Sequence, residues 1–169
     1  MRVLLALAFI FLTLPGTMRA DSASERLAAY SAQLQKEFSD VPGISTSQLA
    51  AINPAPMLLD VREKDEFAVS HLPGAHRAES DTIAQLRKLG ASENTFIVVY
   101  CSVGYRSAVL ARKLQKAGFV NVRNLEGSIF AWANEGRPLV NLSGATSGVH
   151  PFNAYWGRYL DKSKWRWKP

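Results

Sequence analysis

Cysteine is nearly absent from this chain of 169 residues, which holds one cysteine and three histidines. A single cysteine excludes an internal disulfide, so the fold must be stabilised by its hydrophobic core. Cys101, His71, His76 and His150 stand at spacings that match no zinc pattern, so we expect no metal ion. Internal repeats and low-complexity tracts are absent too, which excludes a repeat architecture.

Long apolar runs are also missing. The run at residues 3–14 is shorter than the roughly 20 apolar residues that span a bilayer. It follows Arg2 and is followed by Ala20 and the polar Asp21, which is the layout of a secretory signal peptide over residues 1–20. We therefore expect an exported protein, periplasmic or secreted, and a permanent membrane anchor is the weaker alternative.

A basic face is missing from the body of the chain. Cleavage after residue 20 would remove Arg2 and Arg19, leaving 18 of the 20 basic residues against 14 acidic ones. The excess of positive charge lies wholly in the tail from His150 onward, and residues 21–149 are balanced. Since a nucleic-acid binder shows a basic face on its folded body, we exclude that class.

Strand and helix patterns alternate along the rest of the chain. Ser22 and Glu25 form a capping box ahead of an amphipathic helix, so residues 21–42 are expected to be a helical extension. Residues 43–140 would form the domain, and residues 141–169 a tail rich in Trp, Lys and Arg. Within the domain we expect strands at 57–61, 95–100 and near 121–125, and helices at 46–52, 63–70, 81–89, about 109–117 and near 128–134. This alternation predicts an α/β fold, with an open, mostly parallel sheet and helices on both faces.

Cys101 lies where the strongest strand ends and a helix begins, in the stretch "YCSVGYRS". Ligands of open α/β sheets bind at this edge. The short loop contains Gly104 and can turn several backbone N–H groups inward, which makes a cradle for an anion and favours a thiolate. Arg106 adds a positive charge. From position alone, an inert buried cysteine and a nucleophile are equally supported; an unpaired thiol in an exported protein can also be an intermolecular link.

Three segments, in order, resemble a rhodanese (sulfurtransferase) domain over about residues 44–140. They are "LLDVREKDEFAVSHLPGA", "IVVYCSVGYRSAVLARKLQKAGF" and "VRNLEGSIFAWANEGRPLV". The resemblance implies a single-domain rhodanese fold in which Cys101 attacks the outer sulfur of a donor such as thiosulfate and becomes a persulfide. An external acceptor, such as cyanide, a small thiol or a thioredoxin-like dithiol protein, would then remove the sulfur. The resemblance implies no cofactor.

The resemblance also assigns roles to the loop. The substrate-binding residues would be Ser102, Val103, Gly104, Tyr105, Arg106 and Ser107, whose N–H groups and guanidinium would hold the anionic donor. Asp60 and Arg62 would lie at the same edge of the sheet, as a structural ion pair or loop brace that supports the site. His71 would be structural. The sequence departs from the family at Ser102, where family members often have a basic residue, and at Glu126, where the first glycine of a pair is expected.

Loop length and the tail separate the remaining alternatives. Four residues lie between Cys101 and Arg106, as in sulfurtransferases, whereas phosphatases of this fold have five, so we do not expect phosphatase activity. A non-catalytic binding module is the second hypothesis. The tail has two interpretations: Phe152, Tyr155 and Trp156 pack over the domain, or the Trp, Lys and Arg side chains contact an acidic partner or a membrane surface.

Overall fold

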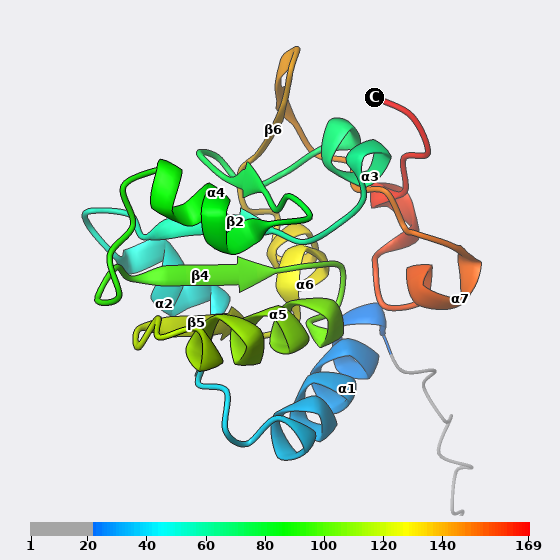
Figure 1. Ribbon diagram of the computed structural model, residues 1–169. Coiled ribbons are helices and arrows are strands. Elements are labelled where there is room, and N and C mark those ends of the chain that lie inside the picture. Colours follow the sequence, from blue (N-terminus) through cyan, green and yellow to red (C-terminus); the bar gives the residue numbers. More distant parts are fainter. Residues whose placement is uncertain (1–21) are drawn as a thin grey trace, which may run out of the picture.

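The computed structural model describes residues 22–169 (Figure 1). The expected signal peptide lies outside these residues. A parallel sheet of five strands forms the centre, in the order β1-β5-β4-β2-β3. The strands are β1 (Gly43–Ile44), β2 (Met57–Asp60), β3 (His76–Arg77), β4 (Ile97–Tyr100) and β5 (Val122–Leu125). Every pairing within this sheet is parallel, which confirms the predicted α/β fold class.

Helices cover both faces of the sheet (Figure 1). Side chains of α4 (Thr82–Lys88) and α5 (Tyr105–Lys116) pack in one cluster with Ile97 and Val99 of β4. Side chains of α2 (Thr46–Ala51) and α6 (Ser128–Asn134) pack in the other cluster with Val98 and Tyr100. Successive strand residues therefore point to opposite faces, and all four residues of β4 are buried, as in a central parallel strand. The remaining domain helix is α3 (Lys64–Val69).

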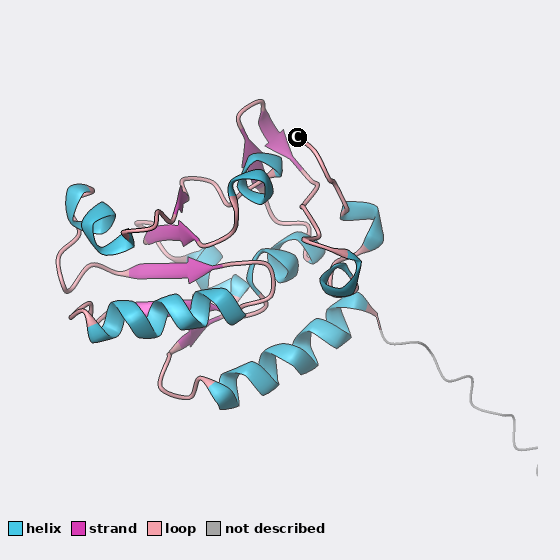
Figure 2. Ribbon diagram, turned by 45° about the vertical axis from the view of Figure 1, so that its right-hand side comes forward, coloured by secondary structure: helices cyan, strands magenta, loops and turns pink. Residues whose placement is uncertain are grey.

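The N-terminal extension forms α1 (Ala23–Glu37), and the predicted capping box is confirmed. The Ser22 side chain accepts a hydrogen bond from the Glu25 N–H, and the Glu25 carboxylate accepts one from the Ser22 N–H. Leu27 packs in the cluster of α2 and α6, whereas Leu34 packs in the cluster of α4 and α5. Because α1 contributes to both clusters, it closes one edge of the domain (Figure 2).

The tail continues from the domain through an antiparallel hairpin of β6 (Leu139–Asn141) and β7 (Gly144–Thr146), which spans the expected boundary at residue 140. It then forms α7 (Ala154–Gly157) and a short 3₁₀ helix, η1 (Lys162–Lys164), beside the start of α1 (Figure 2). The Tyr30 ring contacts the rings of Trp156 and Tyr159, with centroids 5.6 and 5.3 Å apart. The Arg26 guanidinium donates to the Arg158 carbonyl. Among residues 22–169, no helix combines the length and apolar character that a bilayer crossing requires.

Candidate active site

Cys101 lies at the carboxyl end of β4, four residues before the start of α5. Its Sγ accepts a hydrogen bond from the Gly104 N–H, with the sulfur and nitrogen 3.1 Å apart. The first N–H groups of a helix have no partner within the helix and carry its positive partial charge. A thiolate at this position would be stabilised by that charge and by the N–H of Gly104.

Gly104 allows the loop to turn into α5. Its φ of 112° lies in the left-handed region, where a side chain causes strain. A Cβ atom there would also stand 3.0 Å from the Leu34 Cδ2 of α1. The Gly104 carbonyl accepts hydrogen bonds from the Asn124 amide at 3.0 Å and from the Ser107 hydroxyl at 3.1 Å. These two bonds hold the peptide that follows Gly104 and so help to fix the turn that aims the Gly104 N–H at the sulfur.

The N-terminal turn of α6 holds the other side of the loop. The Ile129 and Phe130 N–H groups donate to the carbonyls of Cys101 and Ser102, at 3.2 and 3.1 Å. The Ser128 hydroxyl accepts from the Cys101 N–H at 3.1 Å and donates to the Leu125 carbonyl at 3.2 Å. Helix α6 starts within the segment "LEGSIFAW", so this segment fixes the backbone on both sides of the thiol.

Arg106 is held by a buried carboxylate of α3. Its two terminal nitrogens each donate to one Glu66 oxygen at 3.0 Å, and one of them also donates to the Ser102 hydroxyl at 3.1 Å. The Ser102 hydroxyl itself donates to Glu66 at 3.1 Å. Glu66 and Ser102 are both buried. The positive charge at the end of the loop is therefore already paired with a negative one.

The pKa values of this pair reflect their contact. Burial raises the pKa of Glu66, but its hydrogen bonds and the charge of Arg106 lower that pKa by a larger amount, so the net shift is downward. Burial lowers the pKa of Arg106, and the Glu66 carboxylate with the nearby Cys101 sulfur raises it by more. Both groups are charged at neutral pH, and they form a bidentate pair, which fixes the guanidinium plane.

Asp60 and Arg62 form a second ion pair beneath the site. The Arg62 Nη2 lies 2.6 Å from Asp60 Oδ2, and both side chains are fully buried. The same nitrogen donates to the Ser70 carbonyl at 2.6 Å, so the pair joins the end of β2 to the end of α3. Neither residue lines the pocket beside Cys101. This geometry is that of a brace for the helix that carries Glu66.

A pocket of about 110 Å³ opens beside the thiol. Its walls are formed by the loop residues Cys101, Ser102, Val103, Tyr105 and Arg106, and by Phe152 and Trp156 of the tail. Cys101 itself is 1% exposed, so the pocket is the approach to its sulfur. The Arg106 guanidinium carbon lies 5.1 Å from the centre of the Phe152 ring, within the range of a cation–π contact.

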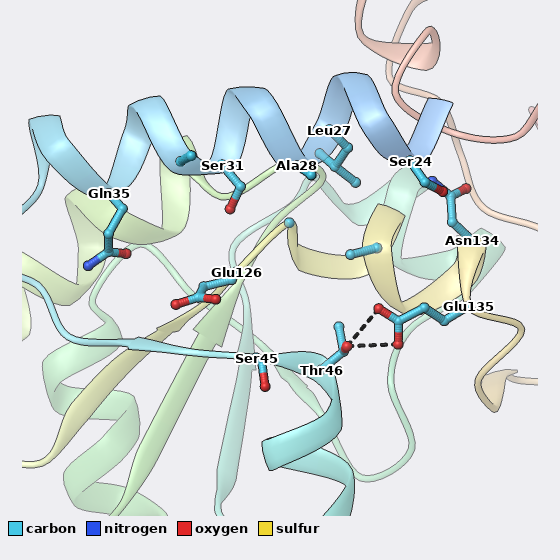
Figure 3. A pocket seen from close by; sticks show the side chains of 13 residues that line it. Ser24, Leu27, Ala28, Ser31, Gln35, Ser45, Thr46, Glu126, Asn134 and Glu135 are labelled. Carbon is cyan, nitrogen blue, oxygen red and sulfur yellow. Dashed lines mark hydrogen bonds between the residues drawn. The ribbon is translucent and has the colours of Figure 1, made fainter. Parts of the chain in front are cut away.

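A larger pocket of about 440 Å³ lies between α1, the start of α2 and α6 (Figure 3). Serine side chains, Gln35, Asn134 and two glutamates surround it, and the Thr46 hydroxyl donates to the Glu135 carboxylate at its edge. Cys101 does not line this pocket. Within residues 22–169, no group of histidine, cysteine and carboxylate side chains could hold a metal ion. The pocket that offers a nucleophile is therefore the small one.

The structure brings most of the expected loop together around Cys101, but not in equal roles. Ser102, Val103, Tyr105 and Arg106 line the pocket. Gly104 supplies the N–H to the sulfur, and Ser107 is buried behind the loop, where its hydroxyl caps the Gly104 carbonyl. The sequence prediction did not include the contacts that Glu66, Ser128, Phe152 and Trp156 make with the loop or its pocket.

Sequence similarity places this geometry in a family. A family model described as a rhodanese-like domain matches residues 45–135, more than half of the chain. The chain belongs to the rhodanese-like domain family. The rhodanese-like segment contains the sheet, the Cys101 loop and Glu66, whereas α1 and the tail with Phe152 lie outside it.

Relatives of this rhodanese-like protein include named sulfurtransferases. A sulfurtransferase of Allochromatium vinosum is 31% identical over 105 residues, which are 62% of this chain and 97% of that protein. An adenylyltransferase and sulfurtransferase of Ogataea parapolymorpha is 28% identical over 92 residues, 54% of this chain but only 23% of that longer protein. The chain therefore matches the whole of one relative and less than a quarter of the other.

Solved structures support the same assignment. The polysulfide-sulfur transferase homodimer of Wolinella succinogenes has a TM-score of 0.53 and 27% identity, covering 73% of this chain and 96% of that one. A rhodanese-like domain protein of Staphylococcus aureus has a TM-score of 0.50 and 28% identity, covering 60% and 98%. Both neighbours share the rhodanese-like fold of this chain.

Proposed function

We propose that this protein transfers a sulfane sulfur from a donor to an acceptor through a persulfide on Cys101. The observation that carries the proposal is the position of the Cys101 sulfur, 3.1 Å from the Gly104 N–H at the start of α5 and open to a pocket. A helix start and a directed N–H stabilise a thiolate, which is the nucleophile that sulfur transfer needs.

In the first step, the Cys101 thiolate attacks the outer sulfur of the donor. A new S–S bond forms to Cys101, the S–S bond of the donor breaks, and the leaving group keeps the electron pair. With thiosulfate the leaving group is sulfite, so no oxidant or reductant is required. The terminal sulfur of the persulfide then carries the negative charge, and the loop N–H groups that held the thiolate stabilise it.

In the second step, an acceptor removes the terminal sulfur and regenerates the thiolate. The chain has no second cysteine to resolve the persulfide, so the acceptor must come from outside. Cyanide would serve in an assay, giving thiocyanate. A small thiol or a thioredoxin-like dithiol protein is the acceptor class we propose for the cell, in an exported setting given by the signal-like residues 1–20.

Steady-state transfer to cyanide tests this function, with thiosulfate, mercaptopyruvate and glutathione persulfide as a donor panel. We expect thiocyanate to form with at least one donor, and we expect Cys101→Ser to abolish turnover while its thermal unfolding remains close to that of the parent. Turnover that survives Cys101→Ser contradicts the mechanism. If none of the donors is turned over, the alternative of a non-catalytic binding module is favoured.

A further inference from the structure

The pocket beside Cys101 has an aromatic wall that residues 45–135, the segment matched by the family model, do not supply. Phe152 and Trp156 line it from the tail, whereas the family match ends at residue 135. Val103 and Tyr105 add apolar surface from the loop, and Tyr105 also contacts Phe38 of the N-terminal extension. The tail, which lies outside the matched segment, therefore contributes part of the surface that a donor meets at the thiol.

Phe152 is fixed in place at the pocket rather than lying there by chance. Its φ of 65° is in the left-handed region, which is costly for a bulky residue and must be imposed by its surroundings. Its N–H donates to the His150 ring at 3.1 Å, and the next residue, Asn153, caps α7 through a bond from the Trp156 N–H at 3.0 Å. Phe152 remains 43% exposed, and its ring lies beside Arg106 at the pocket.

The charges around the thiol do not favour a doubly charged donor. Arg106, the cation that lines the pocket, shares both terminal nitrogens with the Glu66 carboxylate. Burial lowers the pKa of His150, so that ring is neutral at pH 7 and adds no positive charge. With Cys101 as the thiolate, a dianion would approach a site with more negative than positive charge, which weakens its binding.

We infer that the site is selective for monoanionic sulfane-sulfur donors whose sulfur is carried by an apolar organic group, the charge preference coming from the Glu66–Arg106 pair and the apolar preference from Phe152. This inference rests on the proposed sulfur transfer. An organic thiosulfonate or persulfide places its terminal sulfur at Cys101 and its apolar group against Phe152 and Trp156. The Cys101 thiolate attacks the terminal sulfur, the S–S bond of the donor breaks, and an organic sulfinate or thiolate leaves with the electron pair.

The pocket size agrees with this class of donor. Its volume of about 110 Å³ is somewhat smaller than the roughly 150 Å³ of a closed cavity that holds benzene. It is open on one side, so a single ring or short alkyl group can lie against the aromatic wall while the sulfur end enters. The carbon-bearing part of the donor thus replaces water on an apolar surface, which is favourable.

Three donors separate charge from apolar contact, and each releases a sulfur oxyanion, sulfite from thiosulfate and a sulfinate from the two thiosulfonates. Thiosulfate carries two negative charges, methanethiosulfonate carries one, and benzenethiosulfonate carries one together with a ring. We expect kcat/KM to rise in that order for the parent protein, with benzenethiosulfonate at least about tenfold above methanethiosulfonate. In Phe152→Ala the preference for the ring over the methyl group falls by about tenfold, mainly through KM. Tyr155→Ala, which removes an exposed aromatic of α7 that does not line the pocket, keeps it.

Glu66→Gln tests the charge argument separately. The amide is close to the carboxylate in shape but leaves the Arg106 charge unpaired, so kcat/KM for thiosulfate should rise relative to both monoanions, by about tenfold. The inference is wrong if the parent uses thiosulfate best, or if Phe152→Ala keeps the preference for the ring. Either of those two results would still leave the proposed function intact, because in both cases donors transfer sulfur to Cys101. Loss of loading by every donor would instead overturn the proposed function.

Discussion

Gly104→Ala is the substitution that most specifically disturbs the Cys101 loop. A non-glycine residue at φ 112° costs roughly 1–3 kcal/mol. The new Cβ would also stand 3.0 Å from Leu34 Cδ2, inside a packed cluster, which adds about 1 kcal/mol. The total of roughly 2–4 kcal/mol corresponds to a decrease in Tm of roughly 5–15 °C for a chain of this size.

Gly90→Ala is the matched control. Gly90 also has a positive φ, 83°, but a Cβ there meets no atom within 4 Å. It should cost only the backbone strain, about 1–2 kcal/mol. Thermal unfolding followed by circular dichroism measures both variants. Equal Tm decreases in the two variants would refute the argument that the contact between α1 and the loop demands glycine at 104.

The same pair of variants tests the hydrogen bond to the sulfur. A bond to a charged group contributes about 1.5–3 kcal/mol, so displacing the Gly104 N–H should slow alkylation of Cys101 by iodoacetamide at pH 7 by about tenfold or more. Gly90→Ala should leave that rate unchanged. A parental alkylation rate in Gly104→Ala would show that the N–H does not activate the thiol.

Three further predictions concern stability. Folding lowers the pKa of Glu66 from its ordinary value of 4.5, so near that pH the unfolded chain binds more protons than the folded one. The stability that Glu66 contributes is therefore lost as the pH falls below about 4.5. In urea unfolding between pH 5 and about 3, the free energy of unfolding should decrease less in Glu66→Gln than in the parent. Asp60→Ala should lower the free energy of unfolding by about 3–5 kcal/mol, because Arg62 is left buried without its partner. Asp40→Ala, at the exposed pair with Arg112, should lower it by less than about 1 kcal/mol, and similar losses in the two variants would contradict the burial of the Asp60–Arg62 pair. Ser128→Ala removes the acceptor of the buried Cys101 N–H and should cost about 1–3 kcal/mol by urea unfolding; an unchanged midpoint would show that another group accepts this bond.

Local patterns allowed the central parts of the fold to be predicted. The capping box of Ser22 and Glu25 is readable from four residues, and the buried run before Cys101 has no polar residue to suggest an exposed face. Strands β1 and β3 were not predicted, because two-residue strands have no periodicity. They exist through their pairing with β5 and β2.

The missing site contacts depend on tertiary packing. Glu66 was predicted to lie on a helix, but its contact with Arg106 joins residues 40 positions apart. Phe152 reaches the pocket from a tail that packs against Tyr30 of α1, and this packing joins residues far apart in the sequence. The sequence favoured a tail that packs over the domain against one that forms a surface for an acidic partner or a membrane, but it did not show where the tail would lie. The structure buries Trp156 in part and leaves Phe152 and Tyr155 largely exposed.

Intact-mass spectrometry of the protein after one exposure to a sulfane-sulfur donor, with excess donor removed, tests sulfur transfer through Cys101 most directly. Thiosulfate, benzenethiosulfonate and glutathione persulfide should be used in parallel. We predict a mass gain of one sulfur atom with at least one donor, its disappearance on adding cyanide, and no gain in Cys101→Ser. A gain of one sulfur that persists in Cys101→Ser, or no gain with any donor, would contradict a persulfide on Cys101.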